Sequence, residues 1–183
     1  AARDVPGLPL RGGGRDVRLR MRAAALNSLA LFLLTGLPGV TMAPPWVLGA
    51  EGMGVVESVG IAVTSVVVGD TVVINPGLSD RTCEYCLAGE QPLCPRFGIL
   101  GEHFPGTMAE YVVLPAANVL SIPGESDPAE SAAFTLATLT AYRMIVSRAQ
   151  LRARDRLLIW GIGVGVALAA LQIAQLLGAH VTV

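Results

Sequence analysis

The three cysteines of the chain lie together in one short stretch that is rich in turns, and they offer the chemistry of a metal site. With one acidic residue counted first, the possible ligands are separated by two, two and seven residues: Asp80, Cys83, Cys86 and Cys94. A gap of two lets a tight turn aim both side chains at one point, and the longer gap lets the chain return to close the cage. Four such ligands suit tetrahedral Zn²⁺, which binds thiolate sulfur and accepts a carboxylate oxygen. The spacing therefore predicts a zinc site.

Two other interpretations of the cysteines stay open. One is a disulfide with a spare thiol, and the other is three small apolar side chains buried in a core. The odd number of cysteines argues against a lobe held by disulfides alone. Cysteines that only pack in a core have no reason to gather in a hydrophilic loop. We therefore favour the metal site, in which the first ligand is a carboxylate.

A second stretch suited to chemistry is a glycine-rich turn between a predicted strand, residues 156–160, and a predicted helix, residues 166–177. Such a turn lets backbone N–H groups approach a pyrophosphate at the positive end of a helix. Gly161 and Gly163 fit the spacing Gly-x-Gly-x-x-Gly, but Val166 takes the third place. The alternative is a turn that needs glycine only for its geometry. The residues expected to contact a cofactor are Gly161, Ile162, Gly163, Val164, Gly165 and Val166.

The composition excludes several classes of protein. The 183 residues carry 13 basic and 14 acidic side chains, and this balance gives no attraction to nucleic acid or to an anionic membrane. All the basic residues are arginines, which excludes a Walker-type phosphate loop and a Schiff-base lysine. One internal apolar run, residues 23–34, is too short to span a bilayer. We expect no nucleic-acid or membrane partner and a cytoplasmic location, where thiols stay reduced.

Two domains are predicted from the change in apolar periodicity. In residues 1–126, short strands such as 17–22 and 71–74 are broken by glycine and proline, a pattern typical of a small, partly open β-barrel. A short apolar helix is expected over residues 29–35. In residues 127–183 the pattern becomes helical and then alternates strand, helix and strand, which indicates a βαβ unit of a parallel sheet. The fold class is therefore a mixed β-barrel followed by α/β structure.

The second domain opens on a clear helix start. Asp127 is a capping residue, Pro128 occupies the first helical position, and Glu130 completes a capping box. Apolar residues then follow at helical spacing to about Val146. After the strand at residues 156–160, we expect the chain to enter a doubly wound domain.

The cysteine lobe and several strand motifs resemble the medium-chain dehydrogenase/reductase superfamily, which includes zinc-type alcohol dehydrogenases and quinone oxidoreductases. The lobe of that family is Cys-x2-Cys-x2-Cys-x7-Cys, and Asp80 stands here in the place of the first Cys. Residues 49–56 and 106–111 resemble two of its strands. The resemblance spans nearly the whole chain. It implies a GroES-like catalytic domain over residues 1–126 with its zinc lobe at 75–100, and the linking helix and first βαβ of an incomplete Rossmann-type domain over 127–183.

The resemblance also bears on the catalytic residues. In zinc-dependent members the catalytic zinc is bound by a Cys, a His and a second Cys or Asp. These positions correspond here to Asn27, Ala50 and a residue near Leu136, none of which supplies a thiolate or an imidazole. Asn27 instead resembles the Asn of the zinc-independent quinone and enone reductase branch, which implies a catalytic role without a catalytic zinc. The alternative is a turn residue that satisfies nearby backbone groups. Glu51 is either a charge near this corner or a surface carboxylate.

The function implied by the resemblance is nicotinamide-dependent hydride transfer to or from a small carbonyl, quinone or enone, or the corresponding alcohol. Thr140 lies in a segment similar to the one that reaches the nicotinamide in the family. The cofactor is NADP or NAD, because the acidic residue that tells them apart is expected about 20 residues after the glycine turn, at or past Val183. An alternative from another class is a zinc-stabilised binding or scaffold module that has lost catalysis.

The sequence also leads to expectations about the oligomeric state of the protein and the completeness of the chain. We expect the full-length protein to be a homo-oligomer. We also expect the 183 residues to be an incomplete chain, truncated at its C-terminus, inactive and prone to aggregate by itself. The reason is that the apolar faces of its last strand and helix would otherwise meet water.

Overall fold

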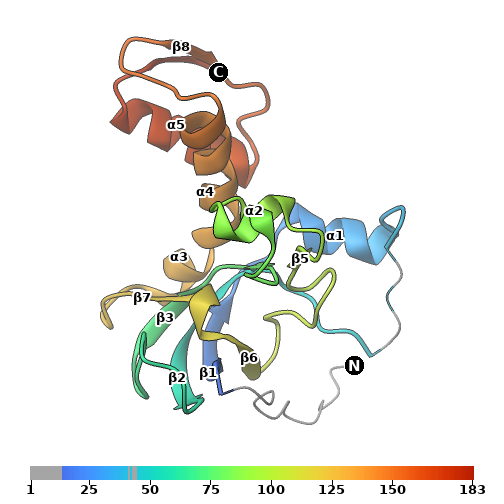
Figure 1. Ribbon diagram of the computed structural model, residues 1–183. Helices are drawn as coiled ribbons and strands as arrows, with labels where there is room; N and C mark the ends of the chain where they lie inside the picture. The colour runs from blue at the N-terminus through green and yellow to red at the C-terminus, as the bar shows by residue number, and fades with distance from the viewer. Residues whose placement is uncertain (1–13, 41, 43–44) are drawn as a thin grey trace. The chain divides into compact units, whose positions relative to one another are not determined.

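The computed structural model of the protein describes residues 14–40, 42 and 45–183 (Figure 1). The chain divides into two compact units, one that ends at Ala133 and one that comprises Phe134–Val183. The first 13 residues of the predicted barrel domain lie outside the described residues, and the predicted boundary between residues 126 and 127 stays a prediction. No helix among the described residues is both long enough and apolar enough to cross a membrane.

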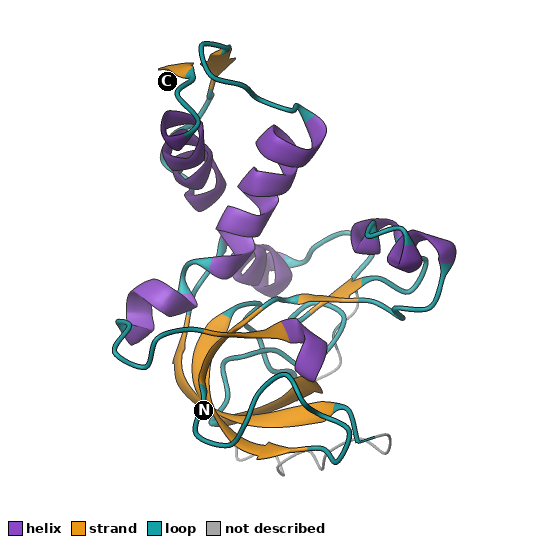
Figure 2. Ribbon diagram, turned by 60° about the vertical axis from the view of Figure 1, so that its left-hand side comes forward, coloured by secondary structure: helices purple, strands orange, loops and turns teal. Residues whose placement is uncertain are grey.

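The first unit is built on a five-stranded antiparallel sheet in the order β6-β1-β2-β3-β7. Figure 2 shows these strands curving around a common interior, so the predicted partly open barrel is confirmed as a curled half-barrel. The register between β1 and β2 shifts twice, and such bulges increase the local bend of a strand. The strands are β1 (Asp16–Ala24), β2 (Gly52–Val59), β3 (Thr71–Ile74), β6 (Tyr111–Pro115) and β7 (Val119–Ser121).

Branched apolar side chains from the inner faces of these strands form the core of the first unit. On β1, Val17 and Leu19 are completely buried, and the strand becomes more exposed towards its end at Ala24. The period of two along a strand places alternate residues on the inner face, which is why Val and Leu repeat at this spacing. The core cluster consists of Val17, Leu19, Val56, Val66, Val72, Ile74, Leu100, Val112, Leu114 and Ala116.

Short elements complete the first unit around this sheet. The predicted apolar helix is present as α1 (Ser28–Thr35). The predicted N-cap is also confirmed, because the Asp127 carboxylate accepts a hydrogen bond of 2.9 Å from the Glu130 N–H at the start of α3 (Pro128–Ala132). The reciprocal bond of the capping box, from the Glu130 side chain, stays a prediction. The remaining elements are β4 (Gly77–Leu78), α2 (Glu84–Leu87), the 3₁₀ helix η1 (Gln91–Leu93), β5 (Gly98–Ile99) and the 3₁₀ helix η2 (Ala116–Asn118).

The second unit contains two helices that pack against each other and a pair of parallel strands. Strands β8 (Arg156–Leu158) and β9 (His180–Thr182) run parallel, with α5 (Gly165–Leu176) between them in the chain, which is a βαβ arrangement. Helix α4 (Thr135–Tyr142) continues into the π-helix η3 (Arg143–Arg148). Small residues dominate the buried cluster of this unit: Ala141, Ile145, Ile159, Ala167, Ala169, Ala170 and Ala174. The start of a Rossmann-type domain stays a prediction.

Two local predictions differ from the structure. The expected continuous helix from Asp127 to Val146 is divided, because α3 ends before Ala133 and α4 begins at Thr135. The predicted buried strand at residues 156–160 is shorter than expected, and the Trp160 side chain is 92% exposed. Alternate side chains of β8 differ in burial, so among the described residues only one face of this strand is packed.

Candidate functional site

The four predicted metal ligands meet in one lobe of the first unit. Asp80 follows β4, Cys83 lies at the N-terminus of α2 and Cys86 within it, and Cys94 follows η1. Their ligand atoms all lie within 4.8 Å of one another, and the three cysteines are free thiols. Tetrahedral zinc with bonds of about 2.3 Å to sulfur places its ligands about 3.8 Å apart, a spacing close to this arrangement. The donor set and its spacing therefore fit a structural zinc.

Backbone groups hold the Asp80 carboxylate in place. Its Oδ1 accepts hydrogen bonds from the N–H groups of Thr82 at 2.8 Å and Cys83 at 2.9 Å. These two bonds, in that order, outweigh desolvation and lower the pKa of Asp80 far below its ordinary value. The Arg96 guanidinium lies 3.9 Å from the other carboxylate oxygen, Oδ2, but its side chain is exposed. Asp80 is thus preorganised as an anion, the form that binds a metal.

The thiols of the lobe influence one another. The Cys86 N–H favours a thiolate at Cys83, but desolvation and the side chains of Cys86, Cys94 and Asp80 together raise the pKa of Cys83 to about 11. For Cys94, desolvation is outweighed by hydrogen bonds from backbone N–H groups and from the other thiols, so its pKa is lowered. The N–H of Arg96 lies 3.4 Å from the Cys94 sulfur. A bound cation would favour the thiolate form of all three cysteines.

Asn27 lies at the N-terminus of α1, where its backbone is extended. Its side chain does not cap the helix. Instead, Asn27 Nδ2 donates a hydrogen bond of 2.6 Å to Oε1 of Glu51. The alternative interpretation of Asn27 as a residue that satisfies nearby backbone groups is therefore not what the structure shows. Its role in catalysis stays a prediction.

Glu51 is a buried carboxylate, which the sequence alone did not establish. Its side chain is buried, with 1% of the residue exposed, so the interpretation as a surface carboxylate is wrong. Its backbone carbonyl accepts hydrogen bonds from the hydroxyl of Thr107 at 2.7 Å and from the N–H of Ala25 at 3.3 Å. Thr107 is itself completely buried. The one signal in the sequence was an acidic residue set among glycines and apolar residues at the start of a strand.

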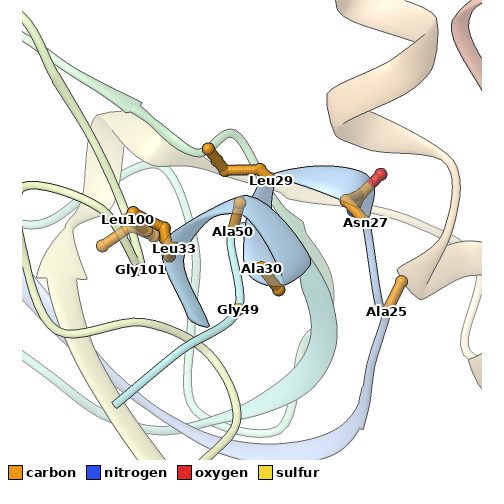
Figure 3. Close-up of a pocket in the computed structure, with 9 residues that line it drawn as sticks. All are labelled: Ala25, Asn27, Leu29, Ala30, Leu33, Gly49, Ala50, Leu100 and Gly101. Carbon is orange, nitrogen blue, oxygen red and sulfur yellow. The ribbon is translucent and has the colours of Figure 1, made fainter. Parts of the chain in front are cut away.

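Asn27 also lines a small hollow, and Figure 3 shows the residues around it. It measures about 210 Å³, including the part open to solvent. Among the described residues that line it, only Asn27 has a polar side chain, and Ala50 lines the same hollow. In residues 14–40, 42 and 45–183, the Asp80 lobe is the one group of His, Cys, Asp or Glu side chains close enough to hold a metal. The lining residues are Ala25, Asn27, Leu29, Ala30, Leu33, Gly49, Ala50, Leu100 and Gly101.

The glycine turn in the second unit leads directly into α5. Gly161 adopts a positive φ of 83°, a conformation that favours glycine. A β-carbon on Gly165 would lie 3.3 Å from the β-carbon of Ala137, so this glycine permits the close approach of α5 to α4. Val164 precedes α5 and is more than half exposed. The predicted cofactor residues thus form one turn at a helix N-terminus, which is a suitable place for an anion.

Thr140 lies on the exposed side of α4. Its hydroxyl donates a hydrogen bond of 2.8 Å to the Leu136 carbonyl, one turn earlier in the helix. The lone pairs of the hydroxyl are not used by this bond. Thr140 and the glycine turn lie in the same unit. Contact of Thr140 with a cofactor stays a prediction.

Comparison with known proteins gives consistent matches. Residues 13–124 match the family described as the alcohol dehydrogenase GroES-like domain. A curated relative from Saccharolobus solfataricus, an NAD-dependent alcohol dehydrogenase, is 37% identical over 131 residues, which are 72% of this chain and 38% of that protein. A crystal structure of an NAD-dependent alcohol dehydrogenase is 49% identical with a TM-score of 0.88, and the match covers 96% of this chain and 51% of the other.

A second solved structure, the cobalt- and zinc-bound thermostable alcohol dehydrogenase from Pyrobaculum aerophilum, is 35% identical with a TM-score of 0.82. That match covers 93% of this chain and 51% of the other. The chain thus spans about half the length of the solved structures that it matches, and less than half the length of the curated relative.

Proposed function

The chain belongs to the alcohol dehydrogenase GroES-like domain family, and on that premise we propose that the whole protein is a nicotinamide-dependent oxidoreductase. It transfers a hydride to or from a small carbonyl, quinone or enone, or the corresponding alcohol. The observation that carries this proposal is the glycine turn at the N-terminus of α5, between parallel strands β8 and β9. The relatives named as NAD-dependent alcohol dehydrogenases support NAD, and NADP is the second candidate.

Residues 127–183 are proposed to be the linking helix and the first βαβ of a Rossmann-type domain. The turn from Gly161 to Val166 would hold the pyrophosphate of the cofactor, and Thr140 would contact the nicotinamide end. Gly161 supports this role because its positive φ shapes the turn, and Gly163 because nothing lies close to the place where its β-carbon would be. The nicotinamide supplies the hydride when it is bound, and the protein orients the two reactants.

One structural zinc per chain is proposed in the lobe at residues 75–100. Asp80, Cys83, Cys86 and Cys94 are its ligands, as the donor set and the spacing of the ligand atoms support. No catalytic zinc is proposed, because Asn27 and Ala50 stand in two of the positions where family members carry ligands. Asn27 is the proposed catalytic residue, and it acts on the substrate by hydrogen bonding.

A second candidate function is a zinc-stabilised binding or scaffold module of the same fold. Val164, the residue directly before α5, favours this candidate, because its exposed β-branched side chain can obstruct a pyrophosphate. We also propose a cytoplasmic location and a homo-oligomeric state for the full-length protein, without a nucleic-acid partner.

Titration of the full-length protein with NADH and NADPH, followed by nucleotide fluorescence, separates the two functions. We expect binding of one nucleotide and turnover of a panel of small alcohols, aldehydes, enones and quinones. Failure of both nucleotides to bind would refute the proposed oxidoreductase function and leave the binding or scaffold module as the remaining candidate. The matched control is Glu57→Gln, which changes an exposed carboxylate of β2 and should leave nucleotide binding unchanged.

A further inference from the structure

The hydrogen bonding of Asn27 is unusual for a residue in its position. Asparagine is among the most favoured residues at a helix N-terminus, because its side-chain oxygen can accept a bond from the free N–H groups of the first turn. Asn27 occupies that position on α1 and does not make this bond. Its carboxamide is instead bonded to a carboxylate that lies 24 residues away in the chain. A local stabilising interaction has therefore been replaced by a long-range one.

The bond to Glu51 fixes which way the carboxamide faces. A carboxylate only accepts hydrogen bonds, so the Asn27 amide must turn Nδ2 towards Glu51 and Oδ1 the other way. In Figure 3 the Asn27 oxygen points away from the apolar side chains of Leu33 and Leu100. Within the part of the chain that the structure describes, no protein group donates a hydrogen bond to this oxygen. The pair thus leaves Oδ1 as an acceptor that points away from the apolar lining of the hollow.

Glu51 is held firmly enough to act as a support. Its side chain is buried, and its backbone carbonyl is bonded both to the buried hydroxyl of Thr107 and to the N–H of Ala25. Ala25 and Asn27 are close neighbours in the chain, so the same segment is tied to Glu51 through backbone and side chain. Such a network restricts the rotation of the Asn27 carboxamide.

We infer that Glu51 is a positioning residue that holds the Asn27 carboxamide so that Oδ1 accepts a hydrogen bond from the hydroxyl of an alcohol substrate. This inference rests on the proposed function. A metal ion binds the oxygen of an alcohol and that of a carbonyl alike, whereas an acceptor oxygen binds only a donor. Oδ1 of Asn27 can therefore bind the hydroxyl of the alcohol but not the oxygen of the carbonyl compound.

The experiment compares KM values in both directions of the reaction, for the full-length protein with its nicotinamide cofactor. Glu51→Ala removes the support and is expected to raise the KM of the alcohol about 3- to 10-fold, the effect of one hydrogen bond, without changing the KM of the carbonyl. Glu51→Gln keeps an acceptor but allows two orientations of the facing amides, so about half the molecules remain competent. We expect its alcohol KM to rise about twofold. Glu57→Gln changes an exposed carboxylate on β2, the strand that follows Glu51, and is the matched control.

A second variant protects the test against misfolding of Glu51→Ala. Asn27→Leu removes the acceptor and should raise the alcohol KM as Glu51→Ala does. In the Asn27→Leu background, Glu51→Gln should have no further effect. An alcohol KM that changes less than twofold in both Glu51→Ala and Asn27→Leu overturns the inference, as does an equal rise for alcohol and carbonyl. A wild-type protein that binds the cofactor and reduces a carbonyl, quinone or enone but oxidises no alcohol overturns the inference alone. A wild-type protein that binds neither nucleotide overturns the proposed function as well.

Discussion

Replacement of Asp80 by asparagine separates its role as a metal ligand from its role in the turn. Asparagine keeps an oxygen that can accept the bonds from Thr82 and Cys83, which measure 2.8 and 2.9 Å, but it loses the negative charge. A neutral acceptor holds these N–H groups less strongly than a carboxylate does, so the turn is weakened but retained. Loss of a group that only supports a ligand reduces metal affinity about 10- to 100-fold, and loss of a ligand should cost at least as much. We therefore expect zinc affinity to fall at least about 10-fold in Asp80→Asn.

The assay is competition for zinc between the protein and a chromophoric chelator at neutral pH. Asp80→Cys restores the four-thiolate set of the family and is expected to bind zinc more tightly than the wild type. Asp70→Asn is the matched control, because Asp70 also accepts a backbone N–H bond, from Val67 at 2.9 Å, and lies outside the lobe. Equal zinc affinity of wild type, Asp80→Asn and Asp80→Cys would show that water or another group fills the fourth position.

Two further predictions concern stability. Leu19→Ala removes a completely buried side chain from the core of the half-barrel and should lower the free energy of unfolding by about 3–5 kcal/mol, measured by urea denaturation of the full-length protein; a loss below about 1 kcal/mol would contradict the packing described. The lowered pKa of Asp80 means that its contribution to folding is present above its ordinary value of 3.8 and is lost as the pH falls below it. Metal-free protein should therefore lose stability in acid, and Asp80→Asn should lack that part of the loss when melting is followed from pH 6 to pH 2.

The metal lobe was predictable because its information is local. Asp80, Cys83 and Cys86 follow one another at gaps of two residues, and such spacing brings ligands together in almost any tight turn. The helix start at Asp127 was predictable for the same reason, since a cap is defined by the next three residues. The family match over residues 13–124 agrees with the resemblance found in these motifs.

The Asn27–Glu51 pair was not predictable from the sequence. The two residues are 24 positions apart, and each had a plausible local explanation, as a turn residue and as a surface carboxylate. The Glu51 carboxylate reaches the Asn27 amide only because the pairing of β1 with β2 brings the end of β1 beside the start of β2. Periodicity also failed at Trp160, because an apolar run indicates a buried strand only when both faces of the strand are covered.

The zinc content of the full-length, catalytically active protein tests the central claim most directly. The proposed enzyme carries one structural zinc, bound by Asp80 and three cysteines, and transfers hydride without a catalytic zinc. We predict one zinc per chain by inductively coupled plasma mass spectrometry in preparations that turn over substrate. Two zinc ions per chain would contradict the proposal that Asn27 and Ala50 leave no catalytic zinc site. An active protein without zinc would contradict the proposed zinc site in the lobe.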